Sequence, residues 1–376
     1  MLIRFQSGSV RLLQGRELTN SKLQLDALDG LRGLAVFLVF LSHTSLRGDN
    51  LIPYADFSGF GKSGVFLFFV LSAFLLTKPF LIRNAEEITL RFIVNYGFRR
   101  FLRIYPLYVI YLAVALVLTA VVPELFGNKS RAYPLPLDFS GYFRHLILQE
   151  GRGVTWSIPV EFSYYFLLPL IALTYSLLLK NRIVPCTIFT LLLIFVSQYF
   201  WPQAESLVND IRVRSYLPIF FLGSFLAVLH HQTTSGEMVW SKESKTLIEA
   251  SGIAAILLLF LMIPTVTSLF VEGGVSNNIF HKQFIIYGVL WSVVLYASIC
   301  GRGWLQRFFE LRLVRYFGFI SFSFYLFHAP VLDLIYSQVD VPGVLYPWLV
   351  LLICVAFSHV SWILLEKPLS RMKLKS

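Results

Sequence analysis

Ten apolar runs, each close to the length that crosses a lipid bilayer, constrain the fold of this chain more than any other feature. A transmembrane helix needs about 20 mostly apolar residues. Few segments alternate apolar and polar residues, and the runs exceed the roughly ten residues of a membrane β-strand. The sequence therefore predicts an all-α, polytopic helical membrane bundle. The expected spans are 28–46, 62–82, 104–123, 158–179, 183–201, 213–230, 249–270, 283–300, 317–337 and 345–365.

The composition excludes the main alternatives to a membrane bundle. Only 14% of the residues are charged and 56% are hydrophobic, whereas soluble domains average about 25% charged residues. A soluble enzyme and a disordered chain are therefore excluded. The three cysteines fall in separate apolar runs, with no spacing for a disulfide framework or a metal site.

The positions of Lys and Arg predict the orientation. With the N-terminus inside, 22 of the 32 Lys and Arg residues fall in cytosolic segments, as the positive-inside rule requires. An even number of spans then places both termini in the cytosol. We expect a cytosolic N-terminal segment without a cleavable signal peptide over 1–27, one transmembrane domain over 28–366 and a short basic tail over 367–376. This topology explains the net charge of +11 without a nucleic-acid partner.

The first span carries three ionisable residues, Asp29, Arg32 and His43. Charged groups inside a membrane are costly and face a cavity or a partner. Arg32 and His43 are eleven residues apart, about three turns plus 20°, so they share one helix face at an axial separation of roughly 16 Å. Asp29 precedes Arg32 by three residues, close enough to pair with it. Gly30 and Gly33 are expected to let another backbone approach closely.

A cationic patch precedes the third span. Arg99 and Arg100 lie four and three residues before Arg103, so the three share one side of a helix, which we expect to be interfacial from Arg91 to Arg103. Two roles are open for this patch: an anchor on anionic lipid and a clamp for phosphate oxygens.

Two further spans carry polar residues in the outer half of the bundle. The fourth span opens with Trp156 and Ser157 and contains Glu161, while Tyr325 and His328 share a face of the ninth span. A carboxylate at the depth of Glu161 is costly unless it is paired. We expect these five residues to line one polar pocket.

Together these motifs resemble the acyltransferase 3 family of membrane enzymes, which O-acylate cell-surface polysaccharides. The resemblance extends from about Leu25 to Arg371, and its most specific element is the Arg32–His43 spacing in LDGLRGLAVFLVFLSH. The other matching segments are GVFLFFVLSAFLL, RRFLRIYPLY, TWSIPVEFSYYFLLPL, ISFSFYLFHAPVL and LLEKPLSR.

The chain departs from the family pattern at three positions. Relatives usually have an acidic or small residue in place of Phe66, glycine in place of Ala73 and a second acidic residue in place of Phe162. Some relatives add a C-terminal hydrolase-like domain that takes over the acyl group. Since this sequence ends at Ser376, we expect transfer to be completed within the bundle.

The resemblance implies an acyl-CoA donor, usually acetyl-CoA, and a hydroxyl acceptor on a lipid-linked or exported glycan. It implies no permanently bound cofactor, an integral location in the bacterial inner (plasma) membrane with lipid as a partner, and essential roles for Arg32 and His43. The family's basic patch corresponds to Arg100 and Arg103.

The residues named above suit the chemistry of acyl transfer from a thioester to a hydroxyl. His43 is expected to act as general base on the acceptor hydroxyl, with a covalent acyl-imidazole as the alternative. Arg32 is expected to position the donor or stabilise an oxyanion, with Asp29 holding it. The phosphates of CoA would bind Arg99, Arg100 and Arg103 together with the basic cluster of 302–315. The remaining five residues, Trp156, Ser157, Glu161, Tyr325 and His328, would bind the acceptor.

Two other functions remain open from the sequence. A secondary transporter also uses intramembrane His, Glu and Arg, but the chain shows no paired broken helices and no repeat symmetry. A non-catalytic membrane scaffold is disfavoured by the intact Arg32–His43 face.

Overall fold

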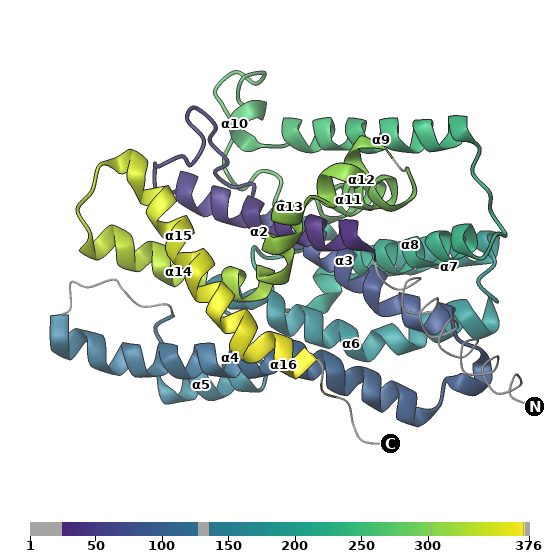
Figure 1. Ribbon diagram of the computed structural model, residues 1–376, viewed down its shortest axis with the longest axis horizontal. Coiled ribbons are helices and arrows are strands. Elements are labelled where there is room, and N and C mark those ends of the chain that lie inside the picture. The colour runs from purple at the N-terminus through teal and green to yellow at the C-terminus, as the bar shows by residue number, and fades with distance from the viewer. Residues whose placement is uncertain (1–24, 127–134, 302, 371, 373–376) are drawn as a thin grey trace, which may run out of the picture.

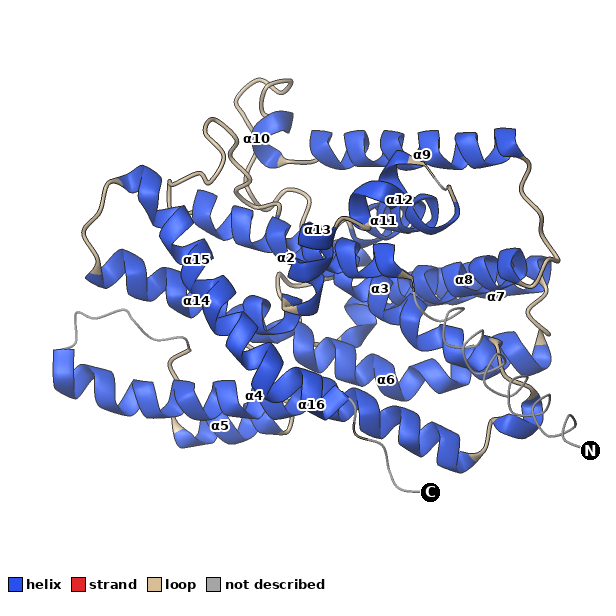
Figure 2. Ribbon diagram, viewed as in Figure 1, coloured by secondary structure: helices blue, strands red, loops and turns tan. Residues whose placement is uncertain are grey.

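The structure, a computed structural model, describes residues 25–126, 135–301, 303–370 and 372. Every regular element in these ranges is a helix, and none of the described residues forms a strand (Figure 2). The predicted all-α fold is confirmed.

A helix occupies each of the ten predicted spans. Within the described ranges, eight helical stretches are long and apolar enough to cross a membrane: α2 (Asp26–Ser45), α3 (Gly61–Leu81), α4 (Leu90–Phe126), η2 to η3 (Gly153–Leu178), α7 (Ile183–Phe200), η5 to α8 (Val213–Thr234), α9 (Lys242–Leu261) and η6 to α16 (Gly343–Ser370). A ninth consists of α13 (Arg312–Phe319) and α14 (Ser321–Gln338), which meet at 74°. The shorter apolar helix α11 (Phe284–Cys300) corresponds to the remaining predicted span, 283–300.

Several of these stretches are composite, and short helices connect others. The fourth contains η2 (Gly153–Trp156), α6 (Ser157–Leu173) and η3 (Thr174–Leu178), and the sixth joins η5 (Val213–Tyr216) to α8 (Leu217–Thr234). The last contains η6 (Gly343–Leu345), α15 (Tyr346–Ser361), η7 (Trp362–Glu366) and α16 (Lys367–Ser370). The connecting helices are η1 (Ala85–Glu87), α5 (Phe139–Leu146), η4 (Gln203–Glu205), α10 (Pro264–Thr267) and α12 (Trp304–Phe309).

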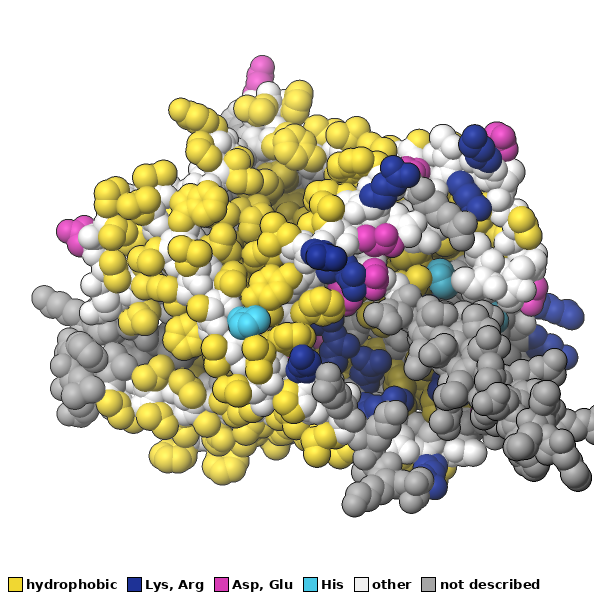
Figure 3. Space-filling view, in the orientation of Figure 1, with side chains coloured by type: hydrophobic (Ala, Val, Ile, Leu, Met, Phe, Trp, Pro, Cys, Tyr) yellow, Lys and Arg dark blue, Asp and Glu magenta, His cyan; other side chains and the backbone are white. Residues whose placement is uncertain are grey.

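The bundle has central and peripheral helices. Most long helices run along the horizontal axis of Figure 1, with α2 and α3 in the middle and α9 and α4 at opposite edges. The central helices α2 and α3 bury 72% and 78% of their most apolar stretch, whereas α7 and α9 bury 17% each. On the face seen in Figure 3, Lys and Arg gather over one half and the other half is almost entirely apolar. The predicted cytosolic placement of the termini falls on residues outside the described ranges.

The basic segment before the third span is not a separate interfacial helix. Residues Leu90–Phe126 form one α-helix of 37 residues, so Arg100 and Arg103 belong to the helix that continues into the bundle. Both arginines line a cavity, and the helix continues past them without a break.

Close contact between backbones fixes α2 against α12 and α13. A methyl group on Gly30 would lie 2.0 Å from the carbonyl oxygen of Phe309, and one on Gly33 would lie 2.4 Å from that of Val314. From the opposite side, a methyl group on Gly318 would lie 1.8 Å from the carbonyl oxygen of Asp29. The expectation that Gly30 and Gly33 allow close approach of a backbone is confirmed.

These contacts predict that Gly318→Ala destabilises the folded bundle by about 1–3 kcal/mol, because the added methyl group forces α2 and α13 apart. The effect is measured as the change in melting temperature in detergent, with unfolding monitored by the fraction of protein that remains soluble. The matched control is Gly97→Ala in α4, where an added methyl group meets nothing within 4 Å. An equal melting temperature for the two variants would contradict the proposed packing.

Candidate active site

A cavity lies between α2, α3, α4, α6 and α14. Its polar lining comes from all five helices and comprises Arg32, Ser72, Arg100, Arg103, Ser157, Glu161, Tyr165, Ser321 and Tyr325. The fold thus brings together the first-span arginine, the cationic patch and three of the five predicted acceptor residues.

The cavity wall carries an excess of positive charge. Arg32, Arg100 and Arg103 line it, and Glu161 is the single acidic residue among the described residues of its wall. Cationic groups in a poorly solvated cleft create a strong local potential that attracts anions. The wall therefore suits an anionic ligand.

Arg32 reaches the point where the ninth span is broken. Its Nη2 donates a hydrogen bond of 3.1 Å to the Oγ of Ser321, the first residue of α14. The Ser321 hydroxyl in turn donates to the carbonyl oxygen of Gly318 in α13, at 2.8 Å. The first residues of α14, which follow the 74° bend, line the cavity, where the helix dipole adds to the positive potential.

Two hydroxyl groups hold the carboxylate of Glu161. Ser72 in α3 donates to its Oε1 at 2.5 Å, and Tyr165, one turn further along α6, donates to the same oxygen at 2.7 Å. Hydrogen bonds of this kind stabilise a carboxylate and fix its orientation. Glu161 is thus a rigid acceptor group on the cavity wall.

His43 and His328 form a direct hydrogen bond. The Nδ1 of His43 lies 2.8 Å from the Nε2 of His328, and the rings are stacked with centroids 4.9 Å apart. The Nδ1 of His328 lies 2.7 Å from the carbonyl oxygen of Tyr325. His328 is fully buried, whereas His43 is half-buried.

The hydrogen-bond partners of the two histidines determine which ring nitrogens carry protons. A carbonyl oxygen only accepts, so the Nδ1 of His328 carries the proton that it donates to Tyr325. A neutral His328 then has a lone pair on Nε2, and the Nδ1 of His43 must donate to it. The lone pair of His43 is therefore on Nε2, which makes no hydrogen bond to a described residue. This is the arrangement of an oriented general base.

Tyr325 connects the histidine pair to the cavity. Its hydroxyl lies 3.1 Å from the Oγ of Ser157, and both residues line the cavity. Its ring centroid is 5.9 Å from that of His328. Among the described residues, neither His43 nor His328 lines the cavity itself, so the pair lies just beyond the end of the cavity at Tyr325.

Three predicted contributions differ from expectation. No ion pair joins Asp29 to Arg32, although both are described, because the guanidinium of Arg32 turns toward Ser321. Arg99 is exposed and does not line the cavity, unlike Arg100 and Arg103. In the predicted second cluster, Arg315 forms an ion pair of 2.8 Å with Asp26, and residue 302 lies outside the described ranges.

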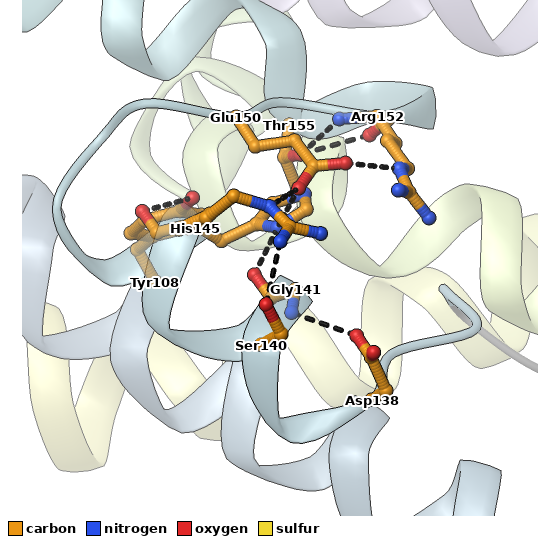
Figure 4. A network of polar contacts seen from close by, with 9 residues as sticks. Tyr108, Asp138, Ser140, Gly141, His145, Glu150, Arg152 and Thr155 are labelled. Carbon is orange, nitrogen blue, oxygen red and sulfur yellow. Dashed lines mark hydrogen bonds and ion pairs between the residues drawn. The ribbon is translucent and has the colours of Figure 1, made fainter.

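A polar network holds the loop that ends at Trp156 (Figure 4). Glu150 accepts from Arg144 at 2.8 Å and pairs with Arg152, and the Thr155 hydroxyl donates to the carbonyl oxygen of Arg152 at 2.8 Å. Partial burial raises the pKa of Glu150, but the hydrogen bond from Arg144 and the charge of Arg152 outweigh it and hold that pKa below its usual value. The network fixes Trp156, which is buried beside the cavity but does not line it.

Ser72 is not among the site residues predicted from the sequence, yet it holds Glu161. The available signal was its spacing, because Ser72 lies seven and three residues after Val65 and Phe69, which line the same cavity. The sequence did not show which helix this face meets.

Comparison with known proteins assigns the chain to a family. Residues 25–366 match the family model described as an acyltransferase domain. O-acetyltransferase OatA of Staphylococcus aureus (strain NCTC 8325 / PS 47) is 24% identical over 377 aligned positions, which cover 94% of this chain and 58% of that protein. Putative O-acetyltransferase SACOL0978 of Staphylococcus aureus (strain COL) is 22% identical, with the same coverage.

The chain thus spans 58% of the length of these relatives. No solved structure matches it. The family match begins at the residue before α2 and ends with η7, so it includes every helix around the cavity and the histidine pair, and the chain belongs to the acyltransferase 3 family.

Proposed function

We propose that this protein is a membrane O-acyltransferase that moves an acyl group, in the first instance acetyl, from acyl-CoA to a hydroxyl of a cell-surface or lipid-linked glycan. The observation that carries the proposal is the His43–His328 pair, whose free Nε2 lies beyond the outer end of a cationic cavity. The names of the relatives, both O-acetyltransferases, support the reaction class. We place the enzyme in the bacterial plasma membrane.

The donor enters from the side of the arginine residues. CoA is a polyanion, and Arg100 and Arg103 are available on the cavity wall to bind its phosphates. By the positive-inside assignment these residues lie toward the cytosol. The pantetheine arm then runs past Arg32 and brings the thioester toward Tyr325 at the outer end.

The depth of Arg32 favours a positioning role over oxyanion stabilisation. Arg32 contacts Ser321, whereas His43 contacts His328, seven residues later in α14, and seven helical residues span roughly 10 Å. A thioester carbonyl within reach of His43 is therefore too far from Arg32 for a direct hydrogen bond. The hydroxyl groups of Tyr325 and Ser157 lie closer to that level and are the candidate donors to the oxyanion.

The reaction then proceeds by general-base catalysis. The Nε2 of His43 takes the proton of the acceptor hydroxyl as its oxygen attacks the thioester carbonyl. The tetrahedral intermediate then collapses and the carbon–sulfur bond breaks. The departing CoA thiolate takes the proton from the imidazolium of His43. His328 stabilises the transient imidazolium of His43 by accepting from Nδ1. A covalent acyl-imidazole on His43 is the alternative route.

The first experiment removes the base. We expect His43→Ala to lower kcat for acetyl transfer by roughly 10²–10⁴-fold, the usual contribution of a general base, at unchanged membrane expression. Activity is measured as radiolabel moved from acetyl-CoA to a glycan acceptor.

The His328 variants separate orientation from packing. His328→Gln retains an oxygen that accepts from the Nδ1 of His43, whereas His328→Leu does not. We therefore expect the Leu variant to lose more kcat than the Gln variant, with similar thermal stability. Near-normal turnover of His43→Ala would refute the base assignment, and equal activity of the His328 variants would refute the orienting hydrogen bond.

The second experiment tests the donor site. Replacing both Arg100 and Arg103 by glutamine should raise the KM for acetyl-CoA more than the KM for the acceptor, because contacts with the phosphates are lost. Arg99→Gln is the matched control, since Arg99 is exposed outside the cavity. If the double variant changes only insertion or topology, the patch is a lipid anchor.

The third experiment tests sidedness in sealed, oriented vesicles. Because the arginines and the histidine pair lie at opposite ends of the site, acetyl-CoA supplied only on the cytosolic side should acylate acceptor confined to the other side. Transfer that requires both substrates in the cytosolic compartment would move the acceptor site to the inner half of the bundle.

A further inference from the structure

Lys62 is a buried cation without a hydrogen-bond partner. It is the second residue of α3, at the end assigned to the outer side, and is 8% exposed. Its Nζ is inaccessible to solvent and makes no hydrogen bond. A buried ammonium group without a counter-ion is strongly unfavourable, so this position is suited to receive an anion.

The neighbouring acid does not neutralise Lys62. Asp210 acts on it electrostatically, but its carboxylate already accepts from the Arg212 backbone and guanidinium and from the Ser215 hydroxyl, at 2.6–3.1 Å. The nearby Lys282 donates to the carbonyl oxygen of Ala204 at 3.0 Å. The surroundings of Lys62 therefore carry a net positive charge.

Lys62 adjoins the outer end of the cavity. It precedes Val65, Phe69 and Ser72, all lining residues, by three, seven and ten residues, so it continues their helix face. Its Nζ lies 5.1 Å from the centroid of the Trp156 ring. That ring packs edge-on against Phe69 at 5.9 Å, and the next residue along the chain, Ser157, lines the cavity.

We propose that Lys62 binds an anionic sugar residue of the acceptor at the end of the cavity near Trp156. The ammonium group pairs with a carboxylate or phosphate carried by the glycan, and the buried indole beneath it supports the lysine side chain. This inference rests on the proposed function for the identity of the ligand as acceptor, but the binding itself does not require turnover.

Binding is measured by calorimetry on the full chain in nanodiscs of zwitterionic lipid. The probes are a hexuronate trisaccharide and its carboxyl-reduced counterpart, which differ only in charge. The wild-type protein should bind the hexuronate roughly 10- to 100-fold more tightly, as expected for a charge-assisted hydrogen bond. Lys62→Met should abolish this preference and leave the affinity for the neutral trisaccharide unchanged, whereas Lys62→Arg should retain part of it.

Lys78→Met is the matched control. Lys78 is in the same helix, is 4% exposed and also has an unpartnered Nζ. Sixteen residues place it about 160° around α3 from Lys62, on the side of His230 and away from the cavity. This variant should keep the wild-type preference. If Lys62→Met fails to fold, as judged by gel filtration, Lys62→Gln replaces it.

The source of the anion is tested in two further arms. Loss of hexuronate binding in nanodiscs of anionic lipid would show that a lipid headgroup occupies the site, and inorganic phosphate that competes as strongly as the trisaccharide would show a site for small anions only. Either result overturns the proposal, as does a wild-type protein without a charge preference or a Lys62→Met variant that keeps it. Acyl transfer assayed in parallel distinguishes the two hypotheses: binding without turnover refutes the proposed function alone, and turnover without the preference refutes the Lys62 site alone.

Discussion

The contact between α2 and the broken span α13–α14 is the constraint on which the site depends. Glycines on both sides bring the backbones together, with Gly33 against Val314 and Gly318 against Asp29. Along this seam Arg32 of α2 is hydrogen-bonded to the first residue of α14, and His43 is hydrogen-bonded to His328, seven residues later. The two residues of α2 are roughly 16 Å apart and their partners roughly 10 Å apart, and the long side chain of Arg32 makes up the difference. A shift of one helix would break both contacts.

The sequence predicted the polar faces but not the partners of each helix. Helical periodicity placed Arg32 with His43 on one face and Tyr325 with His328 on another, and the structure joins these two faces. The bend between α13 and α14 was not predicted, because the surrounding sequence is mostly apolar and has the length of a single span. The sequence also left two roles open for the basic segment of α4, since a segment at a membrane surface has the same sequence pattern as one that lines a cavity; the structure places Arg100 and Arg103 on the cavity wall. Lys62 escaped notice because a lysine near the end of a span is usually exposed.

The proposed acyl transfer has two electrostatic requirements, which the site separates in space. A polyanionic donor needs fixed cations, whereas a general base needs a neutral imidazole with a free lone pair. Three arginines beside an imidazole would disfavour its protonated form, the form that the base must adopt during the reaction. In this structure the arginines line the cavity and the histidine pair lies beyond it, with Tyr325 between them. Distance along α14 therefore allows one bundle to meet both requirements.

The three departures from the family pattern bear on packing rather than on this chemistry. Phe66 is buried against Tyr216, Phe284 and Tyr287, and Phe162 packs against Tyr105 and Tyr165. Ala73 meets α8, where a methyl group on Gly223 would lie 2.8 Å from its Cβ. None of the three departures, all within the described residues, lines the cavity. An acidic residue in place of Phe66 would need a polar partner that this aromatic cluster does not offer, so the substitution in this chain is matched by its neighbours and leaves Arg32, Glu161 and the histidine pair in place.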